Sequence, residues 1–256
     1  MKRFFFSLTA AVVLLLPLTA AAYDYFSNDM MRRPATQLPL YLSLQETLET
    51  GGTPESMLPG IQELIKSATD RSAMTAIAVF LYDRTYRLPA DQQLYPNDLL
   101  LYSDAMYKLA HFEPLERYRV MIQRDAVSSL MLFEALTMDD GIRCKDDTVW
   151  STFKSQVIVP RIKILWDYYP SFEPEEYRRE VEEVKRQVQK MSTMSGDNTE
   201  ICTMGAHPPA KGDELFLPPT EWFEKRPAVM PALEKFWLSR YNKVALETHQ
   251  RAQQQK

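Results

Sequence analysis

Apolar residues recur at helical spacing along most of this chain, and prolines separate one such stretch from the next. Only seven of the 256 residues are glycine, so glycine-rich phosphate loops and dense β-turns are not expected. The pattern predicts an all-α fold, an antiparallel bundle or stacked helical hairpins with about seven to nine helices. The helices are expected over about 40–49, from 54 onward, and over 71–88, 96–110, 114–138, 148–169, 173–191 and 231–251.

Single residues predict where several of these helices begin and what they bury. Asp70 suits the N-cap of the third helix, and Pro114 suits the first position of the longest one. Pro160 should kink or divide the helix that contains it, since proline cannot donate the helical hydrogen bond. The helix over 173–191 carries a narrow apolar seam, which consists of Tyr177, Val181, Val184, Val188 and Met191.

The first 22 residues have the pattern of an export signal. Lys2 and Arg3 precede an apolar stretch, and three alanines that end at Ala22 supply small residues for cleavage. We expect cleavage after Ala22. The alternative is an uncleaved anchor, for which the apolar run is short against a span of roughly 20 residues. No later stretch is apolar enough to span a bilayer, so no transmembrane helix is expected after signal removal.

Removal of residues 1–22 leaves an N-terminal segment, 23–37, that we expect to be extended or flexible, and a single helical domain, 38–256. Six of the 17 prolines fall between 208 and 231, which indicates a long proline-rich loop over 193–231. Without Lys2 and Arg3 the formal charge is 28 − 34 = −6. A mildly acidic chain has no general attraction for nucleic acid.

Cys144 and Cys202 are the only cysteines, and export would take them out of the reducing compartment. We therefore expect a disulfide between them; the alternative is two buried thiols. The bridge would close 202 − 144 = 58 positions and fasten the proline-rich loop to the end of the longest helix. The chain-entropy model gives such a bridge at most about 4 kcal/mol of stability.

The expected compartment is periplasmic or secreted. The sequence after Ala22 contains no N-x-S/T glycosylation site, which weakly favours a bacterial source, and we expect a Gram-negative one. Neither cysteine lies in a CxxC or CxxCH motif, so neither a redox-active dithiol nor covalent haem is expected. No cofactor is expected.

The most unusual local chemistry is a cluster of aspartates on both sides of Cys144. Calcium binding is one interpretation, although the spacing does not match an EF-hand loop. In the structural interpretation, which we favour, Arg143 and Lys145 offset the acids and the last aspartate caps the next helix. No metal site is therefore assigned to the four aspartates, which are Asp139, Asp140, Asp146 and Asp147.

Two pairs of aromatic residues are candidates for a peptide-binding or sugar-binding groove, although aromatic residues more often fill cores. They are Trp166 with Tyr169 and Trp222 with Phe223; Trp222 is the better candidate because prolines surround it. His111 could act as a general base with Asp104 nearby. The two are seven residues apart on one helix face, about 10 Å along its axis, which is too far for direct contact.

The sequence contains no G-x-S-x-G, Walker or HExxH motif. We therefore expect an exported binding or assembly protein without catalytic activity, whose partner is another envelope protein. One alternative is an exported hydrolase that uses carboxylates from the region 139–147 or around His111. Another is a carrier of a small ligand, which would require an enclosed apolar cavity.

Overall fold

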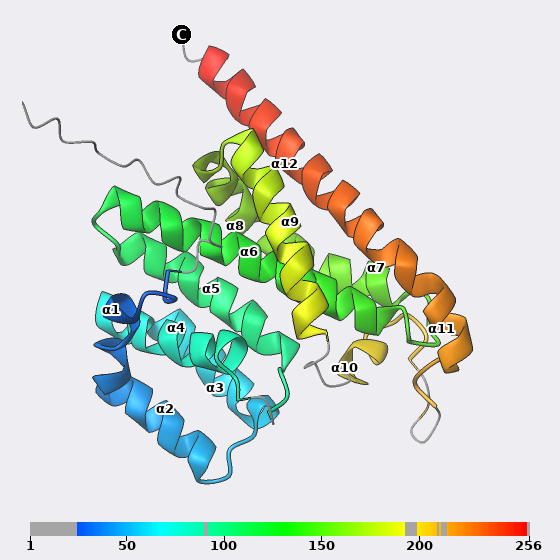
Figure 1. Ribbon diagram of the computed structural model, residues 1–256, viewed down its shortest axis with the longest axis horizontal. Coiled ribbons are helices and arrows are strands. Elements are labelled where there is room, and N and C mark those ends of the chain that lie inside the picture. The colour runs from blue at the N-terminus through cyan, green and yellow to red at the C-terminus, as the bar shows by residue number, and fades with distance from the viewer. Residues whose placement is uncertain (1–24, 90–91, 193–198, 209, 211–213, 255–256) are drawn as a thin grey trace, which may run out of the picture.

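The computed structural model describes residues 25–89, 92–192, 199–208, 210 and 214–254. These ranges contain helices and no β-strand, so the predicted all-α fold is confirmed (Figure 1). Eight of the helices in these ranges have ten or more residues, in agreement with the number expected. The predicted export signal lies outside the described residues. None of the described helices is both long and apolar enough to cross a membrane.

Three consecutive helices form the centre of the molecule: α4 (Arg71–Tyr86), α5 (Pro96–Phe112) and α6 (Glu116–Gly141). The Asp70 carboxylate accepts a hydrogen bond from the Ala73 amide and caps α4, as predicted. Every residue from Ala76 to Tyr82 is buried, because this stretch of α4 is apolar on all sides and other helices pack around it.

Other helices cover this centre from two sides (Figure 1). On one side, α2 (Pro39–Glu49) packs on α4, and α3 (Pro54–Ser67) packs on α4 and α5. On the other side, α9 (Pro174–Met191) and α12 (Val229–Gln254) pack on α6 and on each other. The predicted seam of α9 is buried along its whole length, which explains how so polar a helix is held in place.

The N-terminal segment, which we expected to be extended or flexible, contains two short helical turns. Residues 29–32 form the short helix α1 (Asp29–Arg32), and residues 35–37 form a 3-10 turn. Tyr25 and Phe26 before them are buried, with 3% and 0% of their surface exposed. The segment is too short to show a helical period, so its two anchoring rings gave no periodic signal.

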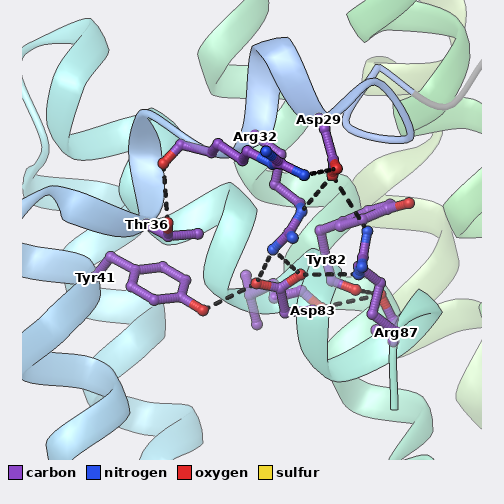
Figure 2. A network of polar contacts seen from close by, with 10 residues as sticks. Asp29, Arg32, Thr36, Tyr41, Tyr82, Asp83 and Arg87 are labelled. Atoms are coloured by element: carbon purple, nitrogen blue, oxygen red, sulfur yellow. Dashed lines mark hydrogen bonds and ion pairs between the residues drawn. The ribbon is translucent and has the colours of Figure 1, made fainter. Parts of the chain in front are cut away.

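Polar contacts join α1 to the core, as Figure 2 shows. The Arg32 guanidinium donates to both oxygens of Asp83 on α4 at 3.0 Å, and the Tyr41 hydroxyl on α2 donates to the same carboxylate at 2.9 Å. Asp29 lies within ion-pair distance of Arg32 (3.6 Å) and Arg87 (3.5 Å). One carboxylate, Asp83, therefore connects three helices.

The prediction for Pro114 is wrong, whereas the prediction for Pro160 is confirmed. Pro114 does not open α6: the helix begins at Glu116 with Leu115 as its N-cap, and the Glu113 carboxylate accepts the Leu115 amide at 3.1 Å. Pro160 does mark a division. A π-helical turn, residues 154–158, separates α7 (Val149–Phe153) from α8 (Val159–Tyr168), which contains Pro160.

Candidate functional site

Cys144 and Cys202 form the predicted disulfide. Cys144 lies three residues beyond α6, and Cys202 ends the short helix α10 (Thr199–Cys202). The sulfur atoms are 2.01 Å apart and the Cα atoms 5.3 Å apart, and both residues are buried. The bridge therefore attaches the segment after α9 to the end of α6, where the sequence placed it.

A short stretch of paired backbone reinforces this attachment. The Lys145 amide donates to the Leu215 carbonyl at 3.0 Å, and the Leu217 amide donates to the Arg143 carbonyl at 2.6 Å. Between these bonds, Cys144 and Phe216 form an antiparallel β-bridge. The pairing fixes the chain just before α11 (Pro219–Lys225), so α11 has a defined position against the end of α6.

Two arginines and three aromatic rings meet at α11. The Arg143 guanidinium lies 4.8 Å from the ring centre of Phe216 and 5.2 Å from that of Trp222. The Arg226 guanidinium lies 5.7 Å from the Trp222 ring. Cations over aromatic faces attract the ring electrons, so both arginines hold Trp222 in place. We call these residues the α11 surface; they are Arg143, Phe216, Trp222, Phe223 and Arg226.

Phe223 is the exposed part of the α11 surface. Its ring stacks on Trp222 with the centroids 4.0 Å apart, yet 55% of Phe223 is exposed to solvent. A large apolar side chain in water is common on protein surfaces; one that is stacked on a fixed tryptophan between arginines has the composition of a binding hot spot.

A cavity of about 420 Å³ lies beside this aromatic pair, between α6, α9 and the start of α12. Its walls are largely apolar and include Val188, Val229 and Met230. Arg226 lines the cavity and also contacts Trp222, so it joins the two parts of the surface. Asp139 holds Arg226 through two hydrogen bonds of 3.0 Å.

Three of the four aspartates around Cys144 have separate partners. Asp139 binds Arg226, Asp140 lies 3.5 Å from Arg143, and Asp147 is exposed. Within the described ranges, no three His, Cys, Asp or Glu side chains are grouped as a metal site would require. Asp147 is not the cap that we expected, because Thr148 occupies the N-cap of α7.

Asp146 instead clamps the loop that follows Cys202. Its carboxylate accepts the Thr148 amide at 2.9 Å, the Thr148 hydroxyl at 2.6 Å and the His207 amide at 2.7 Å. These donors, the Thr148 hydroxyl above all, hold the pKa of Asp146 below its ordinary value. A Cβ atom at Gly205 would lie 1.9 Å from an Asp146 oxygen, so a larger residue there would displace the carboxylate from these hydrogen bonds.

The other aromatic candidates lie away from the α11 surface. Tyr169 is buried, and its hydroxyl accepts a hydrogen bond of 2.5 Å from Arg240. Burial raises the pKa of Tyr169, so the phenol stays neutral. Trp166 is partly buried, with the Lys243 ammonium 5.8 Å from its ring. Tyr169 therefore belongs to the core.

His111 and Asp104 also have different partners. Asp104 forms a two-pronged ion pair with Arg161, whose Nη2 lies 2.9 Å from it. His111 is exposed, and its Nδ1 lies 2.9 Å from the Tyr107 carbonyl oxygen. His207 contributes its backbone amide to Asp146, and the side chain of His249 lies outside the described residues.

Sequence reasoning selected Trp222 and Phe223 but gave no binding role to the residues that position them. Phe216 and Arg226 lie 73 and 83 positions from Arg143, and no periodic or motif signal spans such distances. The prolines that flank α11 were the only feature of the sequence that pointed to a binding surface in this region. A search of family models, of curated proteins and of solved structures found no match for this chain.

Proposed function

We propose that this chain is an exported binding protein of the bacterial envelope, periplasmic or secreted, which docks a protein partner on the α11 surface. The observation that supports this most is the exposed Phe223 ring stacked on Trp222. Aromatic anchors flanked by arginine carry much of the affinity in protein interfaces, because they bury large areas with few rotatable bonds.

The local construction favours binding over catalysis. Asp139 and Arg226 neutralise each other, and so do Lys145 and Glu214, whose side chains lie 3.0 Å apart. Arg143 and Arg226 thus serve to position aromatic rings. The expected partner is a protein with an apolar pocket that receives the Phe223 ring, while the apolar cavity beside Arg226 receives a side chain of the partner.

The test places a photo-cross-linking phenylalanine analogue at position 223 of the whole chain in its native host. A matched control places the analogue at Leu42 on α2, which is 50% exposed and lies on the opposite side of the molecule. We expect a discrete adduct with one envelope protein from position 223 and none from position 42.

A second arm tests the role of the tether. Replacement of both cysteines, Cys144→Ser with Cys202→Ser, should lower the adduct yield from position 223 severalfold, because α11 then loses its fixed position. Circular dichroism checks that the helices persist. Equal adducts from positions 223 and 42, or none from 223 in cells that contain the folded chain, would contradict the proposal.

A further inference from the structure

A second cavity, of about 630 Å³, lies between α3, α5 and α8, away from the α11 surface. Its volume is in the range of small-molecule sites. Apolar side chains line much of it, among them Ile65, Leu101 and Phe112. Ile65 and Leu101 are buried members of the core, so this part of the cavity wall is fixed by packing.

The charged groups around this cavity are unbalanced. Lys66, Lys108 and Arg161 line it together with one acid, Asp104, among the residues described there. Arg161 neutralises Asp104 through hydrogen bonds of 3.1 Å from Nε and 2.9 Å from Nη2. Two ammonium groups therefore remain without a carboxylate in the cavity wall, although the whole chain carries a net charge of −4.

Lys108 is held in position by the end of α3. Its Nζ donates to the carbonyl oxygens of Ile65 at 2.7 Å and Lys66 at 2.6 Å, in the last turn of that helix. An ammonium has three protons, so one remains for a ligand. The Lys66 side chain is exposed, and no ion pair or hydrogen bond engages its ammonium within the described residues. Both lysines can thus donate to an anion.

His111 adds a third polar group. The Tyr107 carbonyl can only accept, so the 2.9 Å contact is a hydrogen bond when Nδ1 carries a proton. Nε2 is then the ring nitrogen left for a ligand or for water. The cavity thus combines an apolar wall with lysine donors and an imidazole nitrogen.

We propose that this cavity binds a small organic anion with one carboxylate and an apolar body. The apolar body lies against Ile65, Leu101 and Phe112, and the carboxylate accepts hydrogen bonds from Lys66 and Lys108. The inference is independent of the α11 surface, which shares no residue with the cavity.

Isothermal titration calorimetry of the whole chain tests the proposal with octanoate as probe and octanol as the uncharged control. We expect octanoate to bind about fivefold more tightly than octanol at low salt, because an exposed charge pair contributes up to about 1 kcal/mol. Lys66→Gln should reduce this preference, because only Lys108 is then left to donate to the carboxylate, and should leave octanol affinity unchanged. Lys235→Gln on α12, also an exposed lysine, is the matched control and should change neither.

A blocking variant locates the site. Gln62 is exposed and lines the cavity, so Gln62→Trp should fill it without disturbing the core, and both probes should lose their affinity. Equal affinity for octanoate and octanol in the unmodified protein overturns the anion assignment. Binding of both probes that survives Gln62→Trp, or a charge preference that is undiminished in Lys66→Gln, overturns the placement of the ligand.

Discussion

Two ion pairs attach outer helices to the central ones, and they differ in how much water reaches them. Glu134 of α6 and Arg240 of α12 have 0% and 6% of their side chains exposed, with Nη1 and Oε1 2.6 Å apart. Asp83 of α4 and Arg32 of α1 keep 20% and 15% exposed (Figure 2). The first pair joins residues 106 positions apart, and the second joins residues 51 apart.

The difference indicates that the stability of the fold depends more on the attachment of α12 than on that of α1. Glu134 and Arg240 are shielded from water, so protein groups must supply their hydrogen bonds. The Trp237 indole donates to Glu134 at 2.5 Å, and the Tyr169 hydroxyl accepts from Arg240. Burial opposes the charge on Arg240, but the Glu134 carboxylate overcomes this and raises its pKa. Each charge therefore requires its partner, whereas water can still solvate Asp83 when Arg32 is removed.

The largest effect is expected from Glu134→Gln. The amide keeps the shape and can accept the Trp237 hydrogen bond, but Arg240 becomes a buried charge without a counter-ion. Loss of one partner of such a pair costs about 3–5 kcal/mol of unfolding free energy. Urea unfolding measures it.

The double variant Glu134→Gln with Arg240→Met is the control. It removes both charges and should recover much of the loss, since a buried pair contributes little net stability against apolar replacements. A double variant that is less stable than Glu134→Gln alone would show that Arg240 acts through packing and not through charge.

A third ion pair, Asp98 of α5 with Arg84 of α4, lies between these extremes. Arg84 donates to Oδ2 from two nitrogens, at 3.0 and 2.7 Å, but Oδ1 is buried with no hydrogen-bond partner among the described residues. Burial raises the pKa of Asp98 to about 6 from 3.8, against the opposing effect of Arg84. The folded state then holds this proton more tightly than the unfolded state.

The stability that Asp98 contributes is therefore present in full below pH 4 and is lost as the pH rises to about 6, by at most about 3 kcal/mol. Asp98→Asn does not titrate, so the difference in unfolding free energy between it and the unmodified protein should change across this range. Urea unfolding at pH 4 to 7 measures that difference. A difference that stays constant over the range would mean that Arg84 keeps Asp98 ionised throughout.

The sequence predicted the local features of this molecule better than its long-range ones. The Asp70 cap follows from the residue preference at helix N-termini, and the seam of α9 follows from the helical period. The disulfide follows from the presence of only two cysteines. Glu134 instead lies within an apolar stretch of α6, and nothing near it indicates a partner on α12. The α11 surface was predicted only in part for the same reason. Trp222 could be selected from the prolines near it in the sequence, whereas its contact with Arg143 arises only from the fold.

The smallest effect is expected from Asp83→Asn, which removes the charge that joins α1, α2 and α4. Ion pairs that water still reaches contribute about 0–1 kcal/mol, and salt screens them, so the loss should shrink as ionic strength rises. The loss in Glu134→Gln should stay nearly constant, because salt does not reach that pair. Urea unfolding at low and high salt compares the two variants.

A second measurement on Asp83→Asn, the pKa of Tyr41, tests the contact between Asp83 and Tyr41 directly. Burial, followed by the hydrogen bond to Asp83, raises the pKa of Tyr41 to about 12. The folded phenol keeps its proton to higher pH than the unfolded one, so its contribution to stability is lost as the pH rises from about 10 to about 12. Loss of the Asp83 charge should lower this pKa towards its ordinary value in a spectrophotometric titration. An unchanged titration combined with a salt-independent loss of stability would mean that Asp83 is as closed to water as Glu134, and the contrast between the two helix attachments would disappear.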